Sequence, residues 1–170
     1  EGIINDRQFT RVNGEILHCD VDTALRFRQE FIRGLITEIT LPALDANGKD
    51  AAFVKMKIQP ENITFESYPT GGPKLQPERE TAQKLWQSNA FRLSLEINGK
   101  KIRCEHVSKI EAITVKIGAK AHQRGHFFLP EYIPTKIDFG KMGVTLPLHY
   151  ASDFIEWYRN CVTVEGGASK

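Results

Sequence analysis

The chain has 170 residues, of which 41% are hydrophobic and 26% charged, so wholesale disorder is excluded and one domain of ordinary size is expected. The 23 Lys and Arg against 21 Asp and Glu leave a net charge of +2, too little for a protein that binds nucleic acid by general neutralisation of phosphates. The 3 Cys are too few and too scattered for a disulfide framework or a zinc ribbon, and no apolar run is long enough for a transmembrane helix.

The first part of the chain, residues 1–65, is predicted to contain a helix followed by a β-hairpin. Near its start, the dipeptide Asn13-Gly14 favours a tight turn. Residues 23–33 then place apolar side chains at helical spacing between an acidic N-cap candidate and Gly34. This pattern predicts a short amphipathic helix.

Two strands and a linker follow. Apolar and polar residues alternate in 35–41 and again in 53–59, on either side of a turn at 45–48. Residues 66–80 are rich in Pro and Gly among polar residues, a composition that breaks helices and strands alike. We therefore expect a linker or long loop there, with one combined domain on its two sides.

The second part, residues 81–170, is predicted to be rich in β-structure. Residues 91–97 alternate, Asn98-Gly99 supplies a tight turn, and 113–117 form a further alternating run.

The rest of the second part contains a loop, an interrupted strand and a helix. Residues 118–134 are interpreted as a long loop, and 137–146 as a strand broken by two glycines. Apolar residues at helical spacing predict a helix over 151–162. The fold class expected is α+β, mainly antiparallel β, with two short helices.

The best metal-binding candidate combines Cys104 and His106 with His122 and His126. The second pair lies in a Gly-containing loop, and the first pair would point to opposite faces of a strand, so side chains without a metal are the favoured interpretation. No local signature activates a thiol or marks a nucleotide site. The sequence therefore gives no positive indication of an enzyme, a metal or a cofactor.

Aromatic residues offer candidate contact surfaces. Trp157 and Tyr158 lie on the predicted amphipathic helix, where core packing is favoured over a ligand platform. Phe127 and Phe128 are adjacent in a loop flanked by Gly and Pro, where contact with a partner protein and burial remain open alternatives.

Several segments resemble the tail-tube protein family, the inner tubes of contractile phage tails and related contractile injection systems. Residues 90–99 are similar to the pattern F-x-L-x-I-x-G of that family, and 107–116 to its V-S-x-I-x-x-(I/L)-x-V strand. Residues 135–142 and 153–158 resemble the next strand and a helix with F-x-x-W-(Y/F). The early segment 33–57 is similar to the hairpin that usually ends the domain.

The resemblance implies a small barrel or sandwich that assembles into stacked, hexameric rings, with each subunit adding strands to a continuous inner β-barrel. Such a structural protein would have no catalytic role. It would be found in a phage tail or an injection particle assembled in the bacterial cytoplasm, with sheath or baseplate proteins as partners and nucleic acid only as lumen cargo. A tube initiator, adaptor or terminator is an alternative within the same machine.

Outside this family, the alternatives are a monomeric β-barrel module that binds a ligand and a metal-dependent enzyme. For a tube subunit, strands 35–41, 53–59 and 113–117 are expected to face the lumen or pair between subunits. The candidate interface residues are Leu35, Thr37, Ile39, Phe53, Lys55, Lys57, Thr114, Lys116, Phe127 and Phe128.

Overall fold

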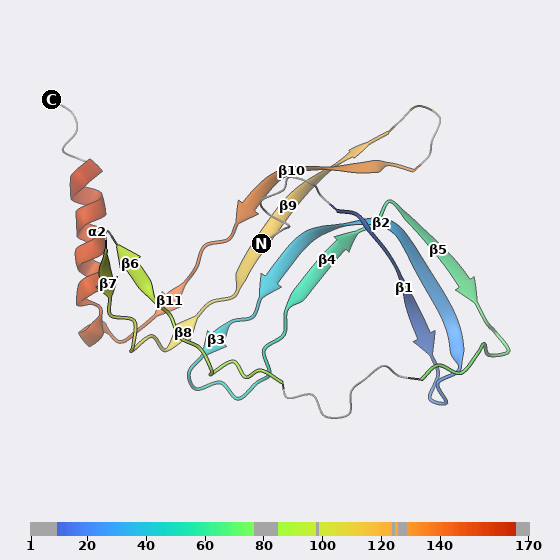
Figure 1. The fold of residues 1–170 in the computed structure, drawn as a ribbon, viewed down its shortest axis with the longest axis horizontal. Helices are drawn as coiled ribbons and strands as arrows, with labels where there is room; N and C mark the ends of the chain where they lie inside the picture. Colours follow the sequence, from blue (N-terminus) through green and yellow to red (C-terminus); the bar gives the residue numbers. More distant parts are fainter. Residues whose placement is uncertain (1–9, 77–84, 98, 124, 126–128, 166–170) are drawn as a thin grey trace. The chain divides into compact units, whose positions relative to one another are not determined.

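The fold consists mostly of antiparallel β-strands with one α-helix (Figure 1). The structure, a computed structural model, describes residues 10–76, 85–97, 99–123, 125 and 129–165. The elements in chain order are β1 (Val12–Cys19), β2 (Leu25–Leu41), β3 (Leu44–Asp45), β4 (Lys55–Gln59), β5 (Asn62–Ser67), β6 (Leu95–Ile97), β7 (Lys100–Ile102), β8 (Lys109–Ile110), β9 (Ile113–His122), β10 (Glu131–Phe139), β11 (Val144–Thr145), the 3-10 turn η1 (Leu148–Tyr150) and α2 (Ser152–Glu165).

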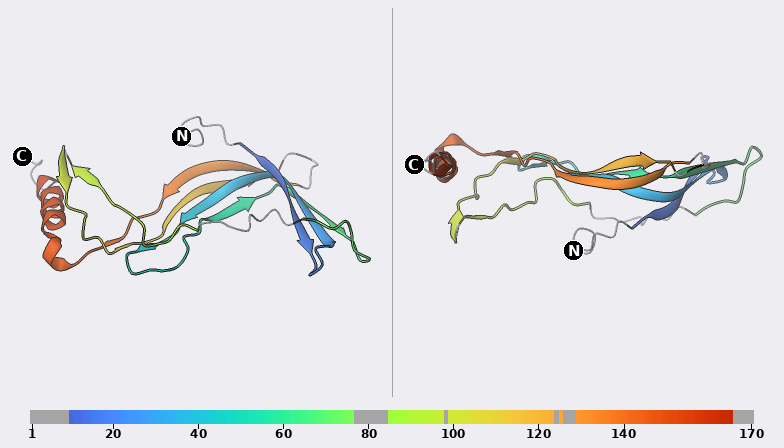
Figure 2. Two further views of the ribbon diagram at one scale, coloured as in Figure 1. Left: turned by 60° about the horizontal axis from the view of Figure 1, so that its bottom comes forward. Right: turned by 90° about the horizontal axis from the view of Figure 1, so that it is seen from above.

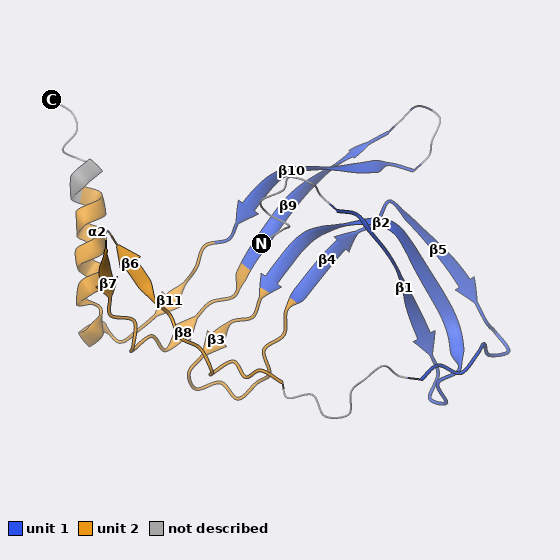
Figure 3. Cartoon of the chain, viewed as in Figure 1, with its two compact units in different colours: residues 1–40, 55–84, 114–140 blue, residues 41–54, 85–113, 141–170 orange. Residues whose placement is uncertain are grey.

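The chain forms two compact units, each built from three separate segments (Figure 3). Unit 1 comprises residues 1–40, 55–84 and 114–140, and unit 2 comprises 41–54, 85–113 and 141–170. The units therefore interleave along the chain, whereas the sequence suggested consecutive parts on either side of 66–80.

Unit 1 contains one six-stranded sheet centred on the long strand β2. Its first half, which we call the arm, consists of β1, residues 25–32 of β2, and β5. Its second half, which we call the panel, consists of β4, residues 35–41 of β2, β9 and β10. Within the described residues these strands form a single layer (Figure 2).

β4 and β5 act as one long partner of β2. The pairing keeps the same register from Phe27↔Ser67 in the arm to Ile36↔Ile58 in the panel. Where the two halves meet, Arg33 adopts a left-handed backbone with φ of 55°, a conformation that is uncommon for a residue other than glycine. Pro60 lies on the partner strand at the same level, between β4 and β5.

Unit 2 packs a small core beneath short strands and the helix. Its sheet has the order β11-β8-β3, and β6 and β7 form a separate hairpin. The buried residues Cys104, Val107 and Ile110 contact partly buried apolar side chains, including Phe154 of α2. Asp153 of the same helix accepts hydrogen bonds from Arg103, which attach the first turn to this unit.

Several secondary-structure predictions are confirmed. The strands predicted at 35–41, 53–59 and 113–117 lie within or overlap β2, β4 and β9, and the helix predicted at 151–162 is α2. A turn was expected at Asn98-Gly99; β6 and β7 pair as an antiparallel hairpin on either side of it, and Gly99 has a φ of 82°.

The helix predicted over 23–33 is wrong, because residues 25–33 form the first half of β2. The apolar residues of this segment satisfy helical spacing and strand alternation equally, and pairing with β1 on one side and β5 on the other decides for the strand. The turn expected at Asn13-Gly14 is also wrong, since both residues lie inside β1 and the chain reverses between β1 and β2 instead.

The long loop predicted over 118–134 is wrong at both ends. β9 continues to His122 and β10 begins at Glu131, with Ala119 paired to Pro134. The fold is thus mainly antiparallel β with one α-helix, and no closed barrel forms among the described residues. No helix among all the described residues of the chain is long and apolar enough to span a membrane.

Candidate assembly surface

The panel has one polar face, on which residues from three strands meet. Nζ of Lys57 lies 2.9 Å from Oε1 of Glu38, and Nζ of Lys116 lies 4.0 Å from Oε2 of the same carboxylate. The hydroxyls of Thr40 and Thr114 share a hydrogen bond of 3.1 Å. The hydrogen bond donated by Lys57 lowers the pKa of Glu38, so this carboxylate carries its charge among the lysines.

Four of the predicted interface residues lie on this polar face: Lys55, Lys57, Thr114 and Lys116. Ile39 points to the opposite face of the panel, because side chains alternate along a strand. Leu35 is only 2% exposed, so its own chain already buries it.

The remaining predicted interface residues are not part of the polar face. Thr37 occupies a bulge of β2, where its hydroxyl donates to the main-chain oxygen of Lys57. Phe53 is exposed but belongs to unit 2. Phe127 and Phe128 lie outside the described residues.

The opposite face of the panel is apolar. Cross-strand partners share a face of a sheet, and the pairs on this face are Ile36 with Ile58, Ile39 with Met56, Ile117 with Ile137, and Val115 with Phe139. Met56 and Phe139 are 57% and 62% exposed. Large side chains on this face therefore contact water.

The arm is amphipathic in the same way. On one face, the rings of Phe27 and Phe65 stack with centroids 5.7 Å apart, and Phe31 pairs with Ile63. On the other face, Arg28 lies between two carboxylates, with Nε 2.8 Å from Glu15 and Nη1 3.8 Å from Glu66. Phe65 is 64% exposed, so the apolar face of the arm is also uncovered.

The apolar faces of the arm and the panel lie on the same side of the sheet. A Cβ added to Gly34 would come within 2.7 Å of Ile58 and 3.4 Å of Phe31, so both side chains lie over this glycine. The side chains on the apolar face have odd residue numbers in β2 up to Phe31 and even numbers directly after Arg33. The change occurs because Arg33 has a left-handed backbone and lies in a bulge against β1, which shifts the alternation of side chains between the two faces. This shift keeps the apolar side chains on one face.

Charged residues join four strands where the arm meets the panel. Glu61, whose side chain is 11% exposed, forms ion pairs with both Arg11 and Arg33. Nη2 of Arg33 also lies 3.4 Å from Glu131, and the N–H of Tyr132 donates to Glu61. We call these five residues the junction cluster; it connects the starts of β1 and β10 to the bend of β2.

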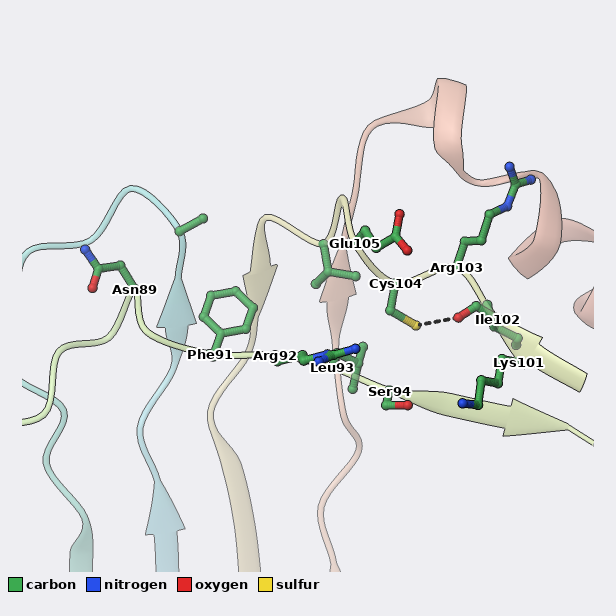
Figure 4. Close-up of a pocket in the computed structure, with 12 residues that line it drawn as sticks. Asn89, Phe91, Arg92, Leu93, Ser94, Lys101, Ile102, Arg103, Cys104 and Glu105 are labelled. Atoms are coloured by element: carbon green, nitrogen blue, oxygen red, sulfur yellow. Dashed lines mark hydrogen bonds between the residues drawn. The ribbon is translucent and has the colours of Figure 1, made fainter.

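Unit 2 contains a hollow of about 400 Å³ between segments 89–94 and 101–107 (Figure 4). Its lining combines the basic residues Arg92, Lys101 and Arg103 with Glu105. Arg103 is held by Asp153, and the thiol of Cys104 donates to the main-chain oxygen of Ile102. The side chains of Arg103 and Lys101 extend in different directions (Figure 4).

The candidate metal ligands from the sequence are not brought together. No group of three or more metal-binding side chains gathers within the described parts of the chain, and His126 lies outside them. Instead, the ring of His106 stacks on Tyr150 with centroids 3.6 Å apart.

Core packing, the interpretation favoured for Trp157 and Tyr158, is wrong for these residues, because they are 42% and 70% exposed.

The continuous apolar face of the sheet and the first half of β10, one of the two edge strands of the panel, are the features that sequence reasoning largely missed. Strand alternation signals one polar and one apolar face, but it does not say whether the apolar face is covered.

No family model, curated protein or solved structure matches the chain.

Proposed function

We propose that the protein is a structural subunit that assembles edge to edge into rings, as in the phage tail tubes that its sequence resembles. The observation that carries this proposal is the panel: a four-stranded antiparallel sheet with one charged face, one apolar face and, among the residues that the structure describes, no further strand paired at either edge. Exposed strand edges readily pair with strands of another molecule. The charged face would line the lumen of the ring.

The directions of the edge strands suit a ring. In the order β10-β9-β2-β4, neighbouring strands run in opposite directions (Figure 1), so the two edge strands β10 and β4 are also antiparallel to each other. Copies related by a simple rotation can therefore add β4 of one subunit to β10 of the next and continue an antiparallel ladder.

One register between these edges matches side chains on both faces. When Asp138 of β10 lies opposite Lys57 of β4, the neighbouring pairs are Phe139 with Met56 and Ile137 with Ile58. Opposite charges meet on the polar face and apolar groups meet on the other, and such cross-strand pairs each stabilise a ladder by about 0.2–1 kcal/mol.

A mixing experiment tests the proposal. Lys57→Asp alone would place two carboxylates at every edge contact, and Asp138→Lys alone would place two lysines there. In an equal mixture, a ring in which the two variants alternate has one lysine and one aspartate at every contact, so rings should form only in the mixture and in the wild type. Light scattering after size exclusion and negative-stain electron microscopy measure the result.

The internal effects of each substitution, such as repulsion between Asp at position 57 and Glu38, are the same alone and mixed, which makes the single variants matched controls. A wild-type protein that stays monomeric at high concentration contradicts the proposal. A mixture that assembles no better than either variant contradicts the edge contact.

A further inference from the structure

The six-stranded sheet of unit 1 leaves large apolar side chains in water on both of its halves. Phe65 in the arm and Phe139 in the panel are each more than 60% exposed. Within the described residues of unit 1, Leu25 and Leu35 are the buried hydrophobic side chains. An apolar sheet face of this kind is normally packed against a second layer.

The arm cannot supply this layer to the panel of its own chain. Both apolar faces lie on the same side of one continuous sheet, as the contacts around Gly34 require. β2 runs through both halves, and its register with β4 and β5 is unbroken across the bend. The ion pairs of Glu61 with Arg11 and Arg33 fasten this bend, so folding the arm onto the panel would break them.

We infer that the apolar face of the arm of one copy packs on the apolar face of the panel of a second copy. With strand and residue spacings typical of sheets, the arm face measures about 280 Å² and the panel face about 320 Å², so each is the right size to cover the other. One such contact buries about 300 Å² of each copy, less than the roughly 800 Å² per partner of a standard two-chain interface, and in a closed ring every copy makes two such contacts.

The distribution of charge agrees with this pairing. Arg28 with its two carboxylates and Glu38 with its two lysines lie on the faces that would remain in water. Packing the apolar faces therefore leaves these two groups of ion pairs in water, and two sheets can stack about 10 Å apart, as in a β-sandwich.

The contact is heterologous, since different surfaces of the two copies meet, and it is thus compatible with a ring. It rests on the proposed self-assembly, but it does not require the edge contact between β4 and β10.

Disulfide cross-linking between copies tests this inference. In a background in which the exposed thiols are removed by Cys19→Ser and Cys161→Ser, Phe65→Cys and Phe139→Cys are made as separate proteins, mixed and mildly oxidised. We expect a disulfide-linked dimer, with mass spectrometry locating the bond between positions 65 and 139. Thr64→Cys is the matched control, because residue 64 lies on the face of β5 opposite to Phe65. The yield of disulfide-linked dimer between Thr64→Cys and Phe139→Cys should be at least about tenfold lower.

Two results overturn the inference. One is a yield with Phe65→Cys no higher than with Thr64→Cys. The other is a link within single molecules when Phe65→Cys and Phe139→Cys are combined in one dilute chain. Repeating the cross-link in the Lys57→Asp background separates the proposals, because a link without rings is the result expected when both hold. Rings in this background contradict the edge contact, and rings of the protein that keeps Lys57, formed without the link, contradict only this inference.

Discussion

Nε of Arg33 lies 2.5 Å from Oε2 of Glu61, and this ion pair joins the two long strands at the point where the arm becomes the panel. Arg33 has a φ of 55° there, and its main-chain N–H donates to the side chain of Asn13 in the bulge between β1 and β2. The left-handed residue, the bulge and the ion pair thus occur at one level of the sheet. Together they set the bend and keep the apolar side chains on a single face.

Glu61→Gln is expected to destabilise unit 1 by about 2 kcal/mol, because it removes a nearly buried carboxylate and leaves Arg11 and Arg33 without their shared partner. Urea denaturation followed by circular dichroism measures the free energy of unfolding. Glu66→Gln is the control, since its ion pair with Arg28 is exposed and 3.8 Å long, and its loss should cost less than about 0.5 kcal/mol. Equal effects of the two variants would contradict the role given to Glu61.

At position 33, glycine is expected to give a more stable protein than alanine, which is the reverse of their usual order in a strand. Both Arg33→Ala and Arg33→Gly lose the ion pair with Glu61, but only glycine adopts a φ of 55° without strain. Arg33→Gly is therefore expected to be more stable than Arg33→Ala by about 1 kcal/mol in the same urea experiment. An alanine variant as stable as the glycine variant would show that the left-handed conformation does not persist in solution.

Three strands of the panel, β2, β4 and β9, could be predicted over most of their panel residues because each has a clear alternation of its own. Residues 113–117 and 35–41 show it directly, and so do Lys55 and Lys57 around Met56. What a single strand cannot reveal is the change of alternation at Arg33 and again at Thr37, because these bulges depend on the partner strands. The continuous apolar face therefore becomes visible only in the structure.

The arm was missed for a different reason. Residues 25–31 fit a helix and a strand equally well, and their strand partners β1 and β5 lie on opposite sides of β2 in the sequence. In the same way, Gly118 and Pro134 indicate a loop when each is considered alone. In the structure Gly118 packs its backbone against Thr135 beside a bulge, and pairing between β9 and β10 tolerates both residues.

Gly14→Ala tests the packing of the apolar face of the arm. A methyl group at this position would lie 2.4 Å from Cζ of Phe31, so the ring must move. Such overpacking typically costs about 1–3 kcal/mol. In a Phe31→Ala background the same substitution should cost less than about 0.5 kcal/mol, because the clash is gone. A cost that is independent of residue 31 would contradict the contact.

The attachment of α2 to unit 2 is expected to depend on pH and to weaken in acid. Hydrogen bonds from the Arg103 guanidinium, to Oδ2 and Oδ1 of Asp153 at 3.0 Å each, lower the pKa of this carboxyl to about 2. A carboxyl with a lowered pKa in the folded state stabilises the fold above its ordinary pKa near 4, and this contribution disappears as the pH falls from about 4 to about 2. Thermal melting followed at 222 nm across this range measures it.

Asp153→Asn removes the titrating group, so the variant should be less stable than the wild type at neutral pH and should approach it near pH 2. Glu156→Gln is the control on the same helix, because Oε2 of Glu156 lies 3.9 Å from Lys100 in an exposed pair. It should retain the pH dependence of the wild type. If Asp153→Asn also retains that dependence, the pair with Arg103 does not hold the first turn of α2 in solution.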